Sequence, residues 1–70
     1  MGKTQRDRIL AHLQRYGNIT PQEALRHYGS FRLAAHIEVY RKAGHRIATK
    51  MVTERGSEFA RYIYEEGQND

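Results

Sequence analysis

Apolar residues recur at helical spacing in the first quarter of the chain. Ile9, Leu10, Leu13 and Tyr16 fall on one side of a helix with 3.6 residues per turn. Thr4 is followed three residues later by Asp7, a pairing typical of the start of a helix. Gly17-Asn18 interrupts the pattern. The sequence therefore predicts a first helix over residues 4–16.

Residues 20–29 show the signals of a second, shorter helix. Thr20 and Glu23 have the spacing of a capping box, and Pro21 lies where its missing N–H is not needed. Gly29 supplies the left-handed conformation that ends such a helix. Its predicted apolar side consists of Ala24, Leu25 and Tyr28.

A third helix is predicted over residues 30–43. Ser30 is the candidate N-cap, and the helix stops at Gly44. Leu33, Ile37 and Tyr40 share one face, which we assign to the core. Two helices joined by a tight glycine turn form a helix-turn-helix, whose second helix commonly enters the DNA major groove.

The opposite face of the third helix is short and mostly uncharged. Steps of about 100° per residue place Arg32, Ala35 and Val39 on it, with His36 on its flank. Small side chains let a helix approach base edges closely, and Ala or Val can contact a thymine methyl group. This face is the candidate reading surface.

After Gly44 the period changes towards two. Residues 45–54 are rich in β-branched side chains, Arg55-Gly56-Ser57 is a turn signal, and residues 58–66 read as a second strand. Ile19, just before Thr20, can act as a hydrophobic staple or as a one-residue strand that pairs with this hairpin. The predicted fold class is α+β, a winged helix-turn-helix with three helices followed by a two-stranded hairpin over residues 1–64.

Charge is unevenly distributed. The chain carries 12 Lys and Arg against 8 Asp and Glu, a net charge of +4. Three acids, Glu65, Glu66 and Asp70, lie near the end, so residues 1–64 carry 12 − 5 = +7. A basic domain favours polyanions, although a solubilising surface would give the same composition. We expect residues 65–70 to form an acidic flexible tail.

Several classes of function are disfavoured by composition. The chain has no cysteine, its four histidines lack metal-ligand spacing, and no catalytic motif is present, so we expect neither an enzyme nor a metal or other cofactor. We infer no small-molecule ligand. No apolar run approaches the roughly 20 residues of a membrane span, and the N-terminus lacks a secretory pattern. The expected location is the cytoplasm.

The chain resembles a family of short winged helix-turn-helix proteins found largely in phages and prophages. The matching segments are Ile19-Thr20-Pro21, Glu23-Ala24-Leu25, Phe31-Arg32-Leu33-Ala34-Ala35-His36-Ile37, Arg41-Lys42-Ala43-Gly44, Thr49-Lys50-Met51-Val52 and Ala60-Arg61-Tyr62. His36 stands where the family pattern has arginine. The resemblance covers about residues 9–64, and it implies a winged helix-turn-helix fold and DNA binding.

Three hairpin cations complete the candidate DNA contacts. Lys50, Arg55 and Arg61 are candidates for backbone or minor-groove contacts, and Arg55 at the tip is the strongest. Charged residues also protect exposed strands from edge pairing. Arg32 could contact guanine or phosphate, His36 could donate to phosphate, and Ser30 could hold a phosphate at the helix start.

The function expected from the sequence is double-stranded DNA binding by a phage-type transcriptional regulator. A single small module has a limited contact area with DNA, so we expect specific binding to need two copies, as a homodimer that forms on DNA. One alternative is a protein-interaction module of the same fold, which would dock through Phe31 and Val39. Another is an excisionase-like or replication-associated architectural protein.

Overall fold

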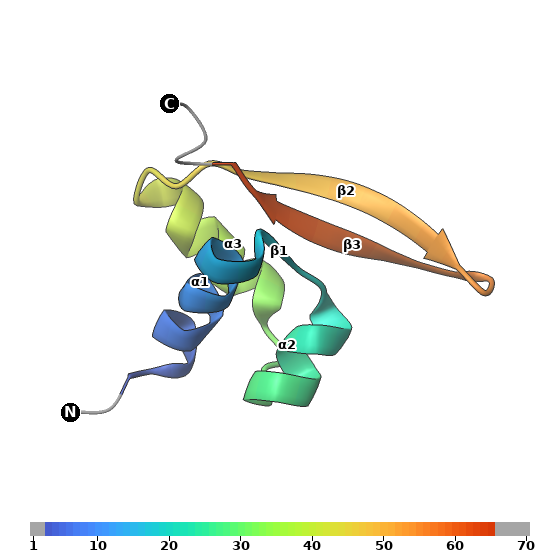
Figure 1. Cartoon of the computed structure of the whole chain (residues 1–70), viewed down its shortest axis with the longest axis horizontal. Coiled ribbons are helices and arrows are strands. Elements are labelled where there is room, and N and C mark those ends of the chain that lie inside the picture. The colour runs from blue at the N-terminus through green and yellow to red at the C-terminus, as the bar shows by residue number, and fades with distance from the viewer. Residues whose placement is uncertain (1–2, 66–70) are drawn as a thin grey trace.

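The computed structural model describes residues 3–65, which fold into three helices and a three-stranded antiparallel sheet (Figure 1). The element order is α1 (Gln5–Tyr16), β1 (Asn18–Ile19), α2 (Pro21–Tyr28), α3 (Leu33–Lys42), β2 (Ile47–Glu54) and β3 (Ser57–Tyr64). The predicted α+β winged helix-turn-helix fold is confirmed, and a short third strand is added to the hairpin.

Local capping explains where the first two helices begin and end. Thr4 and Asp7 form a reciprocal capping box at the start of α1, and Thr20 and Glu23 form another at the start of α2. Each box satisfies two backbone N–H groups that the helix cannot satisfy itself. Gly29 ends α2 in the left-handed region, with φ of 66°. These boundaries follow the sequence prediction closely.

The connection between α2 and α3 differs from the prediction. Ser30 does not cap α3, which begins at Leu33 and has Arg32 as its N-cap residue, without a side-chain hydrogen bond. Ser30 is buried instead; its backbone N–H donates to the Ala24 carbonyl, and its hydroxyl accepts from the Arg32 N–H at 3.2 Å. The hydroxyl stabilises the turn itself, so residues 29–32 form the connection between the helices.

The sheet has the strand order β1-β3-β2. Ile19 pairs with Tyr62, which confirms the alternative that this residue forms a strand with the hairpin. In the hairpin, Glu54 pairs with Ser57, leaving Arg55-Gly56 as a two-residue turn with φ of 52° and 81°. Two successive positive φ angles are typical of the type I′ turn that matches strand twist. Arginine is an unusual residue at the first position of such a turn.

The end of the chain was expected to form an acidic tail over residues 65–70. The backbone N–H of Glu65 donates to the Arg46 carbonyl at 2.8 Å, so this residue still pairs with the segment that leads into β2. The prediction for residues 66–70 lies outside the described residues.

The buried core lies where α1, α2, α3 and the base of the sheet meet. Its apolar members are Ile9, Leu13, Ile19, Ala24, Leu33, Ile37, Tyr40 and Ile47. Two residues that the helical pattern assigned to apolar faces lie outside it, because Tyr16 is 61% exposed and Leu25 is 44% exposed. On α2 the small Ala24 turns inward, which lets this short helix pack closely.

Two side chains on α3 fix the helix against the rest of the domain. The Arg41 guanidinium donates twice to the Ile47 carbonyl, at 3.0 and 2.7 Å, and once to Thr49 Oγ1 at 2.8 Å. The Tyr40 hydroxyl donates to the Arg6 carbonyl on α1, and burial raises its pKa to about 12. Arg41 is therefore a structural link between α3 and β2.

Candidate nucleic-acid interface

The outward face of α3 carries the predicted reading residues. Arg32 and Ala35 are exposed, and Val39 is 37% exposed, while Leu33, Ile37 and Tyr40 on the other face are buried. This division follows from the 100° step between successive helical residues. Three of the predicted site residues are thus brought together on one exposed helix face.

Two further residues border this face. Lys42 is exposed. It lies nine residues after the buried Leu33, and at about 100° per residue this places it on the opposite side of the helix. Lys42 was not among the DNA contacts predicted from the sequence, although the helical step was enough to find it, because a cation near a helix C-terminus also complements the helix dipole. Phe31, just before α3, is 86% exposed and adds a large apolar side chain to the start of the face.

His36 lies on the flank of α3 that faces α1. Its Nε2 atom is 3.4 Å from Oε1 of Gln5, and the Gln5 amide donates to the Tyr28 carbonyl at 2.8 Å. Burial lowers the pKa of His36, and the positive charges of Arg6 and Arg32 lower it further. His36 therefore belongs to a contact between helices as well as to the edge of a cationic surface. Arg6, which the sequence did not single out, contributes to that surface.

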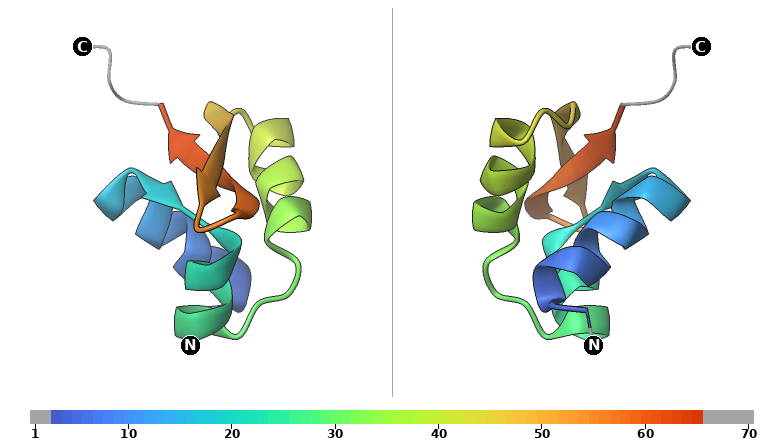
Figure 2. Two further views of the ribbon diagram at one scale, coloured as in Figure 1. Left: turned by 90° about the vertical axis from the view of Figure 1, so that its right-hand side faces the viewer. Right: turned by 90° about the vertical axis from the view of Figure 1, so that its left-hand side faces the viewer.

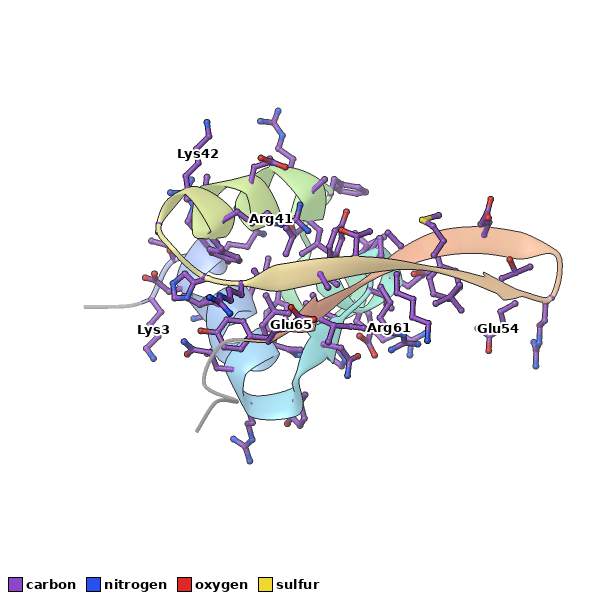
Figure 3. The ribbon with its side chains drawn as sticks, turned by 90° about the horizontal axis from the view of Figure 1, so that it is seen from above. Lys3, Arg41, Lys42, Glu54, Arg61 and Glu65 are labelled. Atoms are coloured by element: carbon purple, nitrogen blue, oxygen red, sulfur yellow. The ribbon has the colours of Figure 1, made fainter. Side chains whose placement is uncertain are left out.

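Lys50 and Arg61 of the hairpin lie on the side of the sheet that faces away from α3. Antiparallel pairing places Lys50 opposite Arg61, and alternation turns both away from Thr49, which contacts Arg41 of α3. Arg61 donates to Asn18 Oδ1 at 2.8 Å. In Figure 3, Lys42 points outward from the end of α3, whereas Arg61 lies on the other side of the hairpin. The structure thus separates Lys50 and Arg61 from the reading face.

The tip of the hairpin has a mixed charge. Arg55 is exposed, and Glu54 and Glu58 beside it are exposed as well. β2 and β3 extend well beyond the helices (Figure 1), which carries Arg55 away from the body of the domain. With two acids around one arginine, the tip offers a single cation to a phosphate backbone.

Two histidines make folding stability depend on acidity. Burial lowers the pKa of His12 and of His36 below the usual 6.5. As the pH falls through this value, the two histidines bind protons more readily in the unfolded chain than in the folded chain. Protonation therefore favours unfolding, and the free energy of unfolding decreases as the pH falls. We expect a lower melting temperature at about pH 5 than at about pH 7.

This expectation is checked by following circular dichroism on heating across that pH range. A variant with His12→Gln and His36→Gln should lose much of the pH dependence, because it removes both titrating groups. An unchanged slope in the variant would contradict the assignment to these histidines.

The described residues, 3–65, contain no helix long and apolar enough to cross a membrane. The same residues hold no group of three or more His, Cys, Asp or Glu side chains arranged to bind a metal ion.

A helix-turn-helix packed on a three-stranded sheet with a projecting hairpin defines the winged helix-turn-helix class. Comparison with known families agrees: the chain belongs to the winged helix-turn-helix domain family, which matches residues 4–66. No curated protein and no solved structure matches the chain. Membership of this family indicates DNA binding.

Proposed function

We propose that the protein binds double-stranded DNA with α3 in the major groove. The observation that carries the proposal is the outward face of α3, where Ala35 and Val39 lie between Arg32 at one end and Lys42 at the other. The acid beside them, Glu38, is paired with Arg41 at 3.6 Å. Such a face can approach base edges without a steric barrier, while cations at both ends attract the phosphates on either side.

Each contact has a chemical role in this proposal. Arg32 donates to guanine O6 and N7 or to a phosphate, and Ala35 and Val39 pack against thymine methyl groups. Lys42 neutralises a phosphate, since its side chain is exposed. Arg55 reaches the neighbouring backbone from the projecting hairpin. Ser30 has no place in the contact because it is buried.

The biological role that we propose is transcriptional regulation of the phage type, in the cytoplasm of a bacterial host. It is supported by the resemblance of residues 9–64 to short phage and prophage proteins. A single module offers a small contact area, so a homodimer assembled on the operator would supply the remaining affinity. We propose neither enzymatic activity nor a cofactor, because the reading face needs none.

A protein-binding role is the second candidate, and the exposure of Phe31 favours it. Phe31 adjoins an apolar groove of about 240 Å³ between α2 and the turn, lined by Pro21, Gln22, Leu25, Ser30, Phe31 and Leu33. Exposed apolar patches often mark protein contacts. An architectural role on DNA is a further alternative, and measurement of bending in the bound duplex would separate it from simple regulation.

The test is a titration of the protein with a random duplex and with a matched single strand, followed by fluorescence anisotropy over a series of salt concentrations. We expect duplex binding whose logarithm falls linearly with the logarithm of the salt concentration, with a slope of roughly −0.9 per phosphate neutralised. A response that is flat with salt and shows no preference for the duplex would contradict the proposal and favour the protein-binding role.

A further inference from the structure

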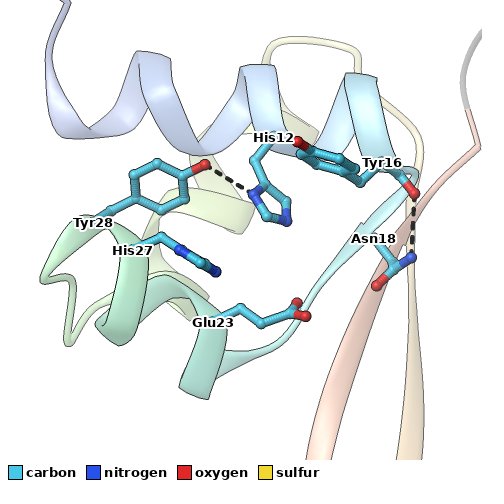
Figure 4. Close-up of a pocket in the computed structure, with 6 residues that line it drawn as sticks. All are labelled: His12, Tyr16, Asn18, Glu23, His27 and Tyr28. Atoms are coloured by element: carbon cyan, nitrogen blue, oxygen red, sulfur yellow. Dashed lines mark hydrogen bonds between the residues drawn. The ribbon is translucent and has the colours of Figure 1, made fainter.

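A second concave surface lies between α1 and α2. It is a groove of about 490 Å³ lined by His12, Tyr16, Asn18, Glu23, His27 and Tyr28 (Figure 4). Another groove, of about 260 Å³, adjoins this one along α1, and His12, Tyr16 and Tyr28 line both grooves. α1 and α3 lie on opposite sides of the hairpin (Figure 2), so this surface is separate from the outward face of α3.

Four ring side chains form the wall of the first groove. The His12 ring centroid lies 4.7 Å from that of Tyr16, 5.6 Å from that of Tyr28 and 6.1 Å from that of His27. A 2.8 Å hydrogen bond between His12 Nδ1 and the Tyr28 hydroxyl holds two of these rings in place. The rings therefore form an aromatic surface that is open to solvent on one side, and His12 and Tyr28 are its two hydrogen-bonded members.

The adjoining groove supplies positive charge. Its cationic residues are Lys3, Arg8 and Arg15. Arg8 and Arg15 lie seven residues apart, which places them on the same side of α1. The Arg15 guanidinium carbon is 5.5 Å from the centroid of the Tyr16 ring, so positive charge directly borders the aromatic surface.

The polar groups of the aromatic groove suit a flat, uncharged ring. Burial lowers the pKa of His12, which favours the neutral imidazole. In Figure 4 the His12, His27 and Glu23 side chains point into the same space. One carboxylate oxygen of Glu23 accepts the Thr20 N–H at 3.0 Å in the capping box. A carboxylate in this position can also accept a hydrogen bond from an amino group on the ring.

We propose that these two grooves together bind a nucleotide. The base stacks in the aromatic groove among His12, Tyr16 and His27, with an amino group directed to Glu23. The 5′-phosphate lies in the adjoining groove and pairs with Arg8 and Arg15, whose guanidinium groups bind phosphate through paired N–H donors. Aromatic side chains beside cations are the usual recognition surface for unpaired nucleotides.

Duplex DNA cannot bind to the aromatic groove in this way. The faces of paired bases are covered by their neighbours in the stack, whereas the aromatic groove requires a base whose face is free. The ligand is thus a free nucleotide or a nucleotide in a single strand, and the site is independent of duplex binding by α3.

The test is a titration followed by two-dimensional NMR of the 15N-labelled protein. AMP is compared with ribose 5-phosphate, which lacks the base, and with a 5′-phosphorylated single-stranded oligonucleotide of deoxyadenosine. We expect saturable shifts of the His12, His27 and Tyr28 resonances with AMP, and roughly tenfold weaker binding of ribose 5-phosphate because stacking is lost. Tighter binding of the oligonucleotide than of AMP would identify the single strand as the source.

Variants locate the site. The double variant Arg8→Ala with Arg15→Ala should weaken AMP binding by roughly tenfold or more. His27→Ala removes an exposed ring and should weaken it severalfold. Arg26→Ala is the matched control, because it removes an exposed cation of α2 that lines neither groove. Equal losses in all these variants, equal affinity for AMP and ribose 5-phosphate, or shifts confined to α3 would overturn the proposal.

Failure of this site and failure of the proposed duplex binding give different results. A variant with Arg32→Ala and Arg55→Asn should lose duplex affinity and still bind AMP as the unmodified protein does. Loss of AMP binding in that variant would contradict a separate site.

Discussion

Replacing Leu13 by alanine is expected to lower the free energy of unfolding by about 2–5 kcal/mol. Leu13 is fully buried at the centre of the core. Its truncation loses the transfer energy of the removed methyl groups and leaves a cavity that close-packed neighbours fill only partly. A 70-residue domain has a total stability of roughly 3.5–10 kcal/mol, so much of the variant should be unfolded at physiological temperature.

Leu25→Ala is the matched control for this prediction. It makes the same chemical change on another helix, but Leu25 is 44% exposed. The expected loss is below about 1 kcal/mol, because less apolar surface is returned to water. Urea denaturation followed by circular dichroism measures both changes. Equal destabilisation by the two substitutions would contradict the core that the structure describes.

The combined replacement Arg32→Ala and Arg55→Asn is expected to weaken duplex binding by roughly 100-fold. Arg32 lies at the start of the reading face and Arg55 at the hairpin tip, and both are exposed. Losing the phosphate contact of Arg55 should also reduce the slope of affinity against salt by roughly 1, and by roughly 2 where Arg32 contacts a phosphate as well. Asparagine is chosen for Arg55 because it tolerates the positive φ of 52° at that position better than alanine does.

The control for this prediction removes the same amount of charge elsewhere. Arg8→Ala with Arg15→Ala takes two cations from the far side of α1 and should change duplex affinity only through the net charge of the domain. Anisotropy titrations at matched salt concentrations compare the two double variants, and melting temperatures verify that both remain folded. A similar loss in both would show that duplex binding is a general effect of charge, without a reading face.

Local sequence signals were sufficient for most element boundaries. The capping boxes of Thr4 with Asp7 and of Thr20 with Glu23 form as predicted, because they involve only residues three apart in the chain. Gly29 ends α2 for an equally local reason, its freedom to adopt a positive φ. The prediction that Ser30 caps α3 also rested on a local signal, and it was wrong. The Ser30 hydroxyl accepts the Arg32 N–H within the turn that precedes the helix.

Contacts between helices and strands determined which residues on the apolar side of α1 are buried and which side chains form hydrogen bonds to other elements, and the periodicity of the sequence could not predict either. The helical pattern placed Leu13 and Tyr16 on one side of α1, yet only the position of α2 and β1 determines that the first is buried and the second exposed. The partners of Arg41 and Arg61 lie on other elements, at Ile47 and Asn18, so no local rule could identify their hydrogen bonds. The grooves along α1 arise in the same way, from side chains of α1, β1 and α2 that meet only in the fold.

The sequence by itself determined the winged helix-turn-helix fold, the two capping boxes and the exposed residues of α3. These features depend on spacing along one helix or strand, which the chain specifies directly. Tertiary structure decided which cations remain free on the reading face, which are used within the domain, and which border the aromatic groove. Those outcomes depend on distances between residues far apart in sequence, and packing of the common core sets those distances.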